Sequence, residues 1–455
     1  MQFTNEIRRL VIGFLLIFVL IALFAAYLSV RGPGTILLRD DNPRLFEKRA
    51  SIVRGTIYDR NENVLVTSLQ ADSGTVSRQY HHSSMNSVLG YYSLRYGEGG
   101  AEAAYNSILN GDDRQLDFEA FFSENLLHRP RYGSDIRLTF DLDIQTHANQ
   151  LMSDYRGAIV VMSVPDGQVL SLVSTPTYDP NLLDEKWIDF VAAEGDPFFN
   201  RVLQGKYQPG SSAYTLLIIS ALLNNIPLDT TFDNATDTVN IADVSLQCVT
   251  QAPSNTLTLA ESYLYGCPAP FAQLAEQIGL NRLEPSFDLF NTAVTLPGFV
   301  PEPAAEDTEV IPFELKDALG QGTIAINPLQ LSTLTAAFIN SGNAPQPYAL
   351  LETRLPGTDQ WLPADEIRPS TPLLTAETAD QVADLMRQID HNTDLDIGGQ
   401  SALAYSGDET HVWFTGFVKT ANNDGIVVVV VIEDSTDTDL AAQIGTSILQ
   451  MSVNQ

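Results

Sequence analysis

The apolar residues of this 455-residue chain fall into runs of different lengths, and the longest predicts a membrane anchor. The run at 10–30 contains no charged residue and is long enough to cross a bilayer as one helix. Apolar residues continue past the small pair Ala25-Ala26, which favours an uncleaved anchor over a cleaved signal peptide. A second run, GIVVVVVI at 425–432, is too short to span a membrane and predicts a buried strand.

A third apolar run has helical spacing and follows the turn Pro209-Gly210. Ser211 or Ser212 is placed to cap the predicted helix, because a serine hydroxyl accepts a hydrogen bond from the free N–H groups of the first turn. An ordinary core helix would show the same pattern, so any chemistry assigned to this segment has to come from its neighbours in the sequence.

Shorter runs predict strands and helices in an order typical of an α+β protein, with helices packed on an antiparallel sheet. Two β-rich runs flank the Asn-rich turn at 61–63, and two more flank Pro165-Asp166-Gly167, so each pair predicts a hairpin. The other predicted elements are a strand and an amphipathic helix within 133–152, a glycine turn and a helix within 320–342, core strands at 411–418 and 426–432, and a closing helix at 439–451.

Composition excludes several classes of function. The formal net charge of −31 argues against binding to nucleic acid or to anionic lipid. No phosphate-binding loop, dinucleotide motif or metal-ligand cluster is present, since only His81 and His82 lie close together, so no cofactor or metal is expected. The two cysteines, Cys248 and Cys267, are a possible disulfide, and two unrelated buried thiols are an equal alternative.

The segment NRVLQGKYQPGSSAYTLL, at 200–217, resembles the part of class B penicillin-binding proteins that carries their catalytic Ser-x-x-Lys. In that family the lysine takes the serine proton from one helical turn away. Ser211 stands at the serine position and Tyr214 at the lysine position. The resemblance therefore implies a nucleophile position without its base, and none of the chain's five lysines has a serine three residues before it.

The two other motifs of the family are altered in the same way. GCPAPFAQLA, at 266–275, resembles the segment around the second motif, Ser-x-Asn, but Gly266 replaces the serine and Pro268 the asparagine. The third motif, Lys-Thr-Gly, is matched by Gln400, Ser401 and Ala402, and HVWFTGF follows it at 411–417. Only the hydroxyl of Ser401 survives, and in the family that hydroxyl binds the substrate carboxylate.

The region between the predicted anchor and residue 133 resembles the non-catalytic pedestal of the same family. Arg54-Gly55 and Asp59-Arg60 match its opening signature, and Glu102 and Tyr105 match its glutamate-bearing helix. The resemblance implies the penicillin-recognising serine transpeptidase (β-lactamase-like) fold. The expected order is a cytoplasmic tail at 1–9, a transmembrane anchor at 10–30, a linker at 31–44, a small β-rich pedestal, or dimerisation-like, domain at 45–132 and a transpeptidase-like domain at 133–455.

Together these observations favour a membrane-anchored, catalytically inactive transpeptidase homologue that serves peptidoglycan synthesis as a scaffold or regulator. The resemblance implies a polytopic glycan polymerase or an active penicillin-binding protein as partner, and Arg8-Arg9 before the span favours an extracytoplasmic bulk. The alternative is a divergent D,D-transpeptidase, or a protein that binds β-lactam or stem peptide weakly, with Ser211 as nucleophile. Tyr214 would then act as base only if a cation, such as Lys206 or Arg201, lowered its pKa by about three units from near 10.

Overall fold

The computed structural model describes residues 2–32, 49–70, 76–112, 130–241, 244–290, 294–300, 312–364, 369–388, 395–406, 409–419 and 424–453. The chain divides into two units, and the smaller one contains helix α1 (Gln2–Gly32). Within α1, the 21 residues Ile7–Tyr27 are long and apolar enough to cross a membrane. Most of the predicted linker at 31–44 lies outside the described residues.

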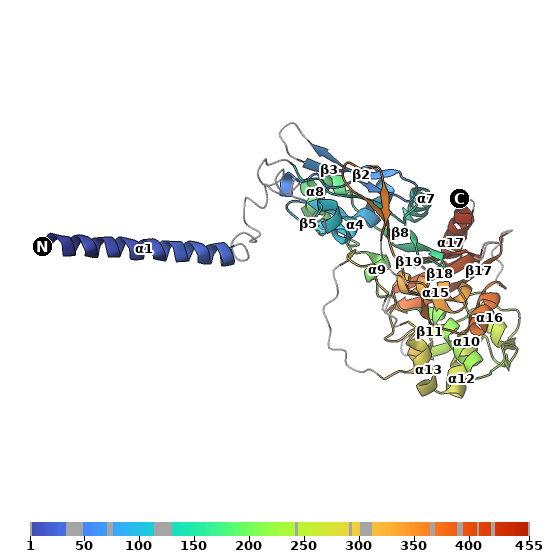
Figure 1. The fold of residues 1–455 in the computed structure, drawn as a ribbon. Coiled ribbons are helices and arrows are strands. Elements are labelled where there is room, and N and C mark those ends of the chain that lie inside the picture. The colour runs from blue at the N-terminus through green and yellow to red at the C-terminus, as the bar shows by residue number, and fades with distance from the viewer. Residues whose placement is uncertain are drawn as a thin grey trace. The chain divides into compact units, whose positions relative to one another are not determined.

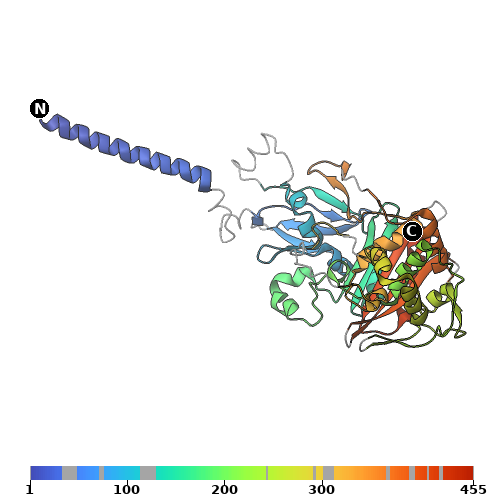
Figure 2. The ribbon, with the colours of Figure 1, turned by 90° about the horizontal axis from the view of Figure 1, so that it is seen from below.

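The larger unit is built on an antiparallel five-stranded sheet (Figures 1 and 2), in which the C-terminal strands lie beside strands from the middle of the chain. Its spatial order is β17 (Ile397–Ser406), β18 (Glu409–Lys419), β19 (Gly425–Glu433), β7 (Gly157–Val164) and β8 (Val169–Thr175). The predicted hairpin around Pro165-Asp166-Gly167 and the two predicted core strands are confirmed.

Helices cover both faces of this sheet. Helices α7 (Leu142–Met152) and α17 (Thr438–Val453) pack on one face, and α15 (Pro328–Ile339) packs on the other, with α10 (Tyr214–Leu223) in the same core. Alternate valines of β19 enter the two cores, Val427 on the α15 side and Val428 on the α17 side. Because both faces are buried, this strand shows a continuous apolar run without polar alternation.

A second sheet contains strands of the predicted pedestal and also strands from beyond its predicted boundary at residue 132. Its order is β15 (Trp361–Pro363), β14 (Leu350–Arg354), β6 (Asp135–Leu138), β1 (Ile57–Tyr58), β2 (Val64–Gln70) and β3 (Val76–Tyr80). The hairpin of β1 and β2 is the predicted one, and Asp59 accepts hydrogen bonds from the backbone of its turn. Strands β6 and β14 join this sheet from segments that the predicted boundary assigned to the following domain.

The remaining elements are short and connect or cover the two sheets. The region of the predicted pedestal contains η2 (Ser83–Met85), α3 (Asn86–Leu89), β4 (Tyr91–Ser93), β5 (Gly97–Gly99), α4 (Gly100–Ala104) and α5 (Asn106–Asn110). The helices that follow are η3 (Pro180–Leu182), α8 (Leu183–Val191), α9 (Arg201–Gln204), η4 (Gly210–Ala213), α11 (Leu259–Leu264), α12 (Pro268–Ile278), α13 (Leu280–Phe287), α14 (Leu315–Ala318) and α16 (Ala376–Met386). The remaining short strands are β9 (Thr231–Phe232), β10 (Val239–Ile241), β11 (Val244–Leu246), β12 (Leu257–Thr258), β13 (Asn343–Ala344) and β16 (Thr371–Pro372).

The predicted serine cap is wrong. Ser211 and Ser212 lie within the 3₁₀ turn η4, and α10 begins only at Tyr214, where Ala213 is the N-cap residue without a side-chain hydrogen bond. The physical reason is that the hydroxyl of Ser211 has another partner, because the backbone N–H of Leu403 in β17 donates to it across 3.3 Å.

Candidate functional site

The turn that presents Ser211 is held between strand β17 and the glycine turn at 320–322. Gly210 has a φ of +55°, and a Cβ atom there would come within 2.2 Å of the Leu403 carbonyl oxygen. Its N–H donates to the Gly320 carbonyl across 2.9 Å. Glycine is required at position 210 because a side chain fits neither this backbone conformation nor this space. The turn therefore places Ser211, which is only 4% exposed, against the free edge of the sheet.

Tyr214, at the lysine position, is a core residue. Its ring stacks on Phe271 of α12, with centroids 4.3 Å apart and planes 18° apart, and it is 3% exposed. Burial, and secondarily the nearby Tyr405, raises the pKa of the Tyr214 phenol above its usual value. A phenol must lose its proton before it can act as a base, and this environment makes that loss harder.

Gln400, at the position of the third-motif lysine, joins a closed network of neutral groups. Its Nε2 donates to the Ser211 carbonyl across 3.3 Å, and its Oε1 accepts from Thr215 Oγ1 and from the Tyr263 hydroxyl, each across 3.0 Å. Thr215 Oγ1 and the Tyr263 hydroxyl oxygen are also 2.9 Å apart, and because each hydroxyl has one proton, either both donate to Gln400 or one of them donates to the other. Polar groups are thus satisfied beside Ser211 with no ionic charge, which is the condition under which they can be buried.

The two residues after Gln400 lie away from Ser211 or lack polar groups. Successive residues of a strand face opposite sides of the sheet. The Ser401 hydroxyl accordingly donates to the Thr438 carbonyl at the start of α17, across 3.4 Å. Ala402 is fully buried in the core that contains Tyr214.

The second motif position forms a turn and a helix start. Gly266 has a φ of +60°, and a Cβ atom there would lie 2.6 Å from Val249 Cγ2. Cys267 is joined to Cys248 by a disulfide and is the N-cap residue of α12. Pro268 occupies the first turn of that helix, where its missing N–H costs nothing. This local structure supports the helix whose Phe271 packs on Tyr214.

Neither cation that the sequence offered for activating Tyr214 is available for that role. Arg201 is 1% exposed and donates to Glu433 Oε1 across 2.9 Å and to the Gly195 carbonyl across 2.6 Å. Lys206 is exposed to solvent. Within the described part of the chain, Ser211, Tyr214 and Gln400 form no hydrogen bond with a lysine or an arginine.

Sequence reasoning missed Thr215 and Tyr263. Thr215 lies in α10, whose apolar pattern predicts only a core helix, and Tyr263 lies in α11, for which the sequence analysis predicts no element. They were out of reach because Gln400 lies 185 residues from Thr215 and 137 residues from Tyr263.

The chain is similar to known proteins over nearly its whole length. Residues 157–450 match the model of the penicillin-binding protein transpeptidase domain, and residues 54–136 match that of the penicillin-binding protein A dimerisation domain. The peptidoglycan D,D-transpeptidase PbpA of Mycolicibacterium smegmatis is 25% identical over 493 aligned positions, covering 99% of each chain. The peptidoglycan D,D-transpeptidase MrdA of Acinetobacter baumannii is 27% identical over 287 positions, covering 56% of this chain and 42% of that protein.

Solved structures show the same fold. Penicillin-binding protein A from M. tuberculosis, in an imipenem acyl-enzyme complex, superposes with a TM-score of 0.78 at 24% identity, covering 90% of this chain and 100% of that one. The D,D-transpeptidase domain of a peptidoglycan glycosyltransferase from Eggerthella lenta gives a TM-score of 0.73 at 24% identity, covering 89% and 100% of the two chains. The family match extends over more than half of the residues, and the chain therefore belongs to the penicillin-binding protein transpeptidase family.

Proposed function

We propose that this protein is a membrane-anchored, catalytically inactive member of the family that acts as a scaffold or regulator in peptidoglycan synthesis. The observation that carries the proposal is the environment of Tyr214, a buried phenol with a raised pKa at the position of the activating lysine. The loss of nucleophile or base alone costs a serine hydrolase about a millionfold in kcat. Here the neutral network of Gln400 also lacks the cation that would favour ionisation.

The residues that stand in place of the family's motif residues have structural roles. This supports selection for a folded, non-catalytic protein. Gly266 meets a backbone requirement, Pro268 begins α12, and Gln400 completes a buried hydrogen-bond network. A protein that drifted without function would leave such polar and steric requirements unmet.

Labelling with a fluorescent penicillin in native membranes tests this proposal. We expect no covalent labelling of the full chain, and none of the variant Ser211→Ala. PbpA of M. tuberculosis, for which a penicillin G acyl-enzyme complex is known, is the positive control for the probe. Labelling of the chain that disappears in Ser211→Ala would overturn the proposal.

One observation favours a second candidate function, a divergent D,D-transpeptidase that acylates Ser211. The Leu403 N–H donates to Ser211 Oγ across 3.3 Å, so a backbone donor of the kind that stabilises an oxyanion lies next to the nucleophile position. The relatives named above are D,D-transpeptidases, so this is the activity to expect if the chain is an enzyme. The same labelling experiment separates the two candidates, because only the enzyme needs a reactive Ser211.

The proposed location is the cytoplasmic membrane, with the bulk of the chain extracytoplasmic. Helix α1 supplies a candidate span, and the disulfide between Cys248 and Cys267 fits an oxidising compartment. Protease added to spheroplasts should digest the larger unit. Its complete protection, with the outer membrane removed, would place it in the cytoplasm.

The proposed partner is a polytopic glycan polymerase or an active penicillin-binding protein. Affinity capture of the full chain from mild-detergent membranes should recover one of these. In a control variant, residues 7–27 are replaced by a polyleucine span of equal length, which keeps the protein in the membrane. Loss of the partner from this variant would show that the anchor sequence itself contributes to binding, beyond location in the same membrane. Recovery of no cell-wall synthesis protein by the natural chain would contradict the scaffold role.

A further inference from the structure

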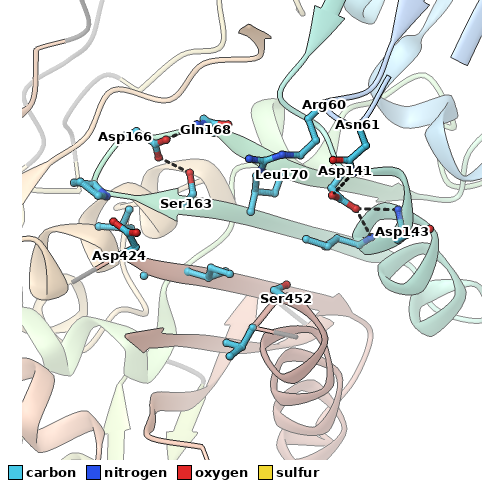
Figure 3. A pocket seen from close by; sticks show the side chains of 16 residues that line it. Arg60, Asn61, Asp141, Asp143, Ser163, Asp166, Gln168, Leu170, Asp424 and Ser452 are labelled. Atoms are coloured by element: carbon cyan, nitrogen blue, oxygen red, sulfur yellow. Dashed lines mark hydrogen bonds between the residues drawn. The ribbon is translucent and has the colours of Figure 1, made fainter. Parts of the chain in front are cut away.

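Two cavities of the larger unit differ in whether the fold already uses their polar groups. The first, of about 860 Å³, lies where β7 ends and β19 begins (Figure 3). Its Asp141 accepts hydrogen bonds from the backbone of α7 and from Asn61 Nδ2. Its Asp166 accepts from Ser163 Oγ and from Gln168 Nε2. These carboxylates stabilise local turns, so they do not indicate a ligand.

The second cavity, of about 290 Å³, is close to the lower limit of about 300 Å³ for small-ligand sites. One side of its wall comes from α3, β4, β5 and the start of α4, and the other side from the end of β8 and from residues between 197 and 204. Gly90, with a φ of +69°, lets the first side pack tightly, since a Cβ atom there would lie 2.1 Å from the Gly99 carbonyl oxygen. That side of the wall is therefore rigid backbone.

Asn86 lines this cavity with an amide oxygen that has no partner. The side chain is 5% exposed, and its Nδ2 donates to the Tyr178 carbonyl across 2.8 Å, which identifies the other end of the amide as Oδ1. In the described part of the chain Oδ1 accepts no hydrogen bond, and it is not enclosed by protein atoms, so it is open to the cavity. A buried acceptor without a donor is unfavourable, and a ligand N–H group would satisfy it.

Tyr178 supplies a second buried polar group to the same wall. It is 9% exposed, and its ring packs on Phe198 with centroids 4.5 Å apart. Its hydroxyl has no hydrogen-bond partner among the described residues and is likewise not enclosed by protein atoms. Burial raises the pKa of this phenol, so it stays neutral and keeps its lone pairs available to a donor.

Glu98 gives the cavity a negative charge. Among the residues that line the cavity, it is the one with a formal charge at neutral pH. Its Oε1 accepts from Asn106 Nδ2 across 3.0 Å, but its carboxylate forms no ion pair in the described part of the chain. Burial, and secondarily the charge of Glu98, raises the pKa of Tyr91, so this charge acts on the cavity wall.

A carboxylate without a cation disfavours an anionic ligand and favours a cationic one. The rest of the wall suits the same choice, because aromatic rings attract cations to their faces and cover apolar groups well. Five aromatic side chains line the cavity, those of Tyr91, Tyr178, Phe198, Phe199 and Phe299.

We infer that this cavity binds an organic ammonium group carried on an apolar body. An ammonium group has three N–H donors and no acceptor, which matches the unpartnered oxygens of Asn86 and Tyr178 and the charge of Glu98. The aromatic side chains cover the apolar body. No residue of the Ser211 network lines the cavity, so this binding is independent of acylation at Ser211 and goes beyond the proposed function.

Isothermal titration calorimetry on the full chain in detergent tests the inference with 2-phenylethylamine, a cation at neutral pH, and 2-phenylethanol, its uncharged counterpart. We expect saturable binding of the amine and at least about tenfold weaker binding of the alcohol. Glu98→Gln should weaken the amine about tenfold and leave the alcohol unchanged, because only the amine carries a charge. Tyr178→Phe should weaken both probes about threefold, since both donate to its hydroxyl.

Nα-acetyl-lysine methylamide distinguishes two sources of the ammonium group. Binding at least as tight as that of 2-phenylethylamine identifies the lysine side chain of a peptide, whereas weaker or absent binding identifies a small-molecule amine.

Glu377→Gln and Tyr155→Phe are the matched controls, since both side chains are exposed and neither lines the cavity. They should leave all affinities unchanged, and thermal unfolding midpoints verify that every variant is folded. Three results would overturn the inference: no saturable binding of either amine to the folded chain, equal binding of 2-phenylethylamine and 2-phenylethanol, or equal effects of Glu98→Gln and Glu377→Gln.

Discussion

Gln400 and Ser211 are 189 residues apart in the chain and joined by a hydrogen bond from the glutamine amide to the serine carbonyl. The same side chain accepts from Thr215 and Tyr263, so one neutral group ties β17 to η4, α10 and α11. In an active enzyme of this family, the resemblance places a lysine here. With glutamine in place of lysine, this position carries no charge and connects these elements through buried hydrogen bonds.

Replacing Gln400 with leucine should destabilise the protein. Thr215 and Tyr263 would lose their shared acceptor while staying buried, which costs about 1–3 kcal/mol in the free energy of unfolding. Urea denaturation, followed by tryptophan fluorescence, measures the loss. Gln388→Leu is the matched control on an exposed position and should change stability by less than about 0.5 kcal/mol. Equal losses in both variants would show that the network contributes nothing.

Restoring the family's serine at Gly266 should be unfavourable. The new Cβ would lie 2.6 Å from Val249 Cγ2, and the φ of +60° strains any L residue other than glycine. We expect Gly266→Ser to lose about 2–4 kcal/mol of stability, the sum of a strain of about 1–3 kcal/mol and a steric cost.

The control for that substitution is Gly357→Ser. Gly357 has a φ of +76° and nothing within 4 Å of a Cβ atom, so it reports backbone strain without a clash. A loss at Gly266 no larger than the loss at Gly357 would mean that Val249 moves freely and that steric exclusion does not explain the missing serine.

The pattern of apolar and polar residues predicted strands and helices of the larger unit, because that pattern follows which side chains are buried. The unbroken valines of β19 and the two hairpin turns at 61–63 and 165–167 were sufficient to identify the corresponding strands. Long-range pairing was not predictable in this way. Strand β6 pairs in parallel with β1, and β14 joins β6 from more than 200 residues later in the chain, because register between distant strands leaves no periodic signal.

The positions of the candidate site residues in the sequence were predictable, but the contacts of their side chains were not. The flanks of the first and third motifs predict Ser211, Tyr214 and Gln400 as residues of one site, and the structure joins Gln400 to Ser211 by a hydrogen bond. The stacking of Tyr214 on Phe271 and the turn at Gly266 depend on side-chain packing that no spacing rule contains.

Neutralising Glu102 in the pedestal should be strongly destabilising. Its carboxylate is fully buried between Arg54 at 2.7 Å and Arg78 at 2.8 Å. Burial alone would raise the pKa of Glu102, but the two guanidinium groups outweigh it and leave the pKa below its usual value. Glu102→Gln leaves two buried arginines uncompensated, which costs about 3–5 kcal/mol.

The matched control for Glu102 is Glu62→Gln. Glu62 pairs with Arg137 at 2.8 Å, but its side chain is 57% exposed. Loss of an exposed ion pair costs about 0–1 kcal/mol. Urea denaturation at pH 7 compares the two, and a similar small loss in both variants would contradict a structural role for the buried pair.

Tyr214 should make the protein less stable at alkaline pH. Burial raises the pKa of its phenol, so the folded chain holds this proton more tightly than the unfolded chain, whose tyrosines titrate near 10. The stabilisation is fully present below about pH 10 and is lost as the pH rises further, by about 1.4 kcal/mol per pH unit for one such group. Tyr214→Phe keeps the stack on Phe271 and should reduce the slope of unfolding free energy against pH above 10.

At pH 8 the same variant should lie within about 0.5 kcal/mol of the natural protein, because the Tyr214 hydroxyl makes no hydrogen bond in the described part of the chain. Tyr263→Phe separates the two effects. Burial also raises the pKa of Tyr263, so its slope should fall too, but its hydroxyl bonds Thr215 and Gln400, so stability at pH 8 falls by about 1 kcal/mol. An unchanged slope in Tyr214→Phe would mean that this phenol ionises as readily in the folded chain as in the unfolded one, which is the property that a catalytic base at this position requires.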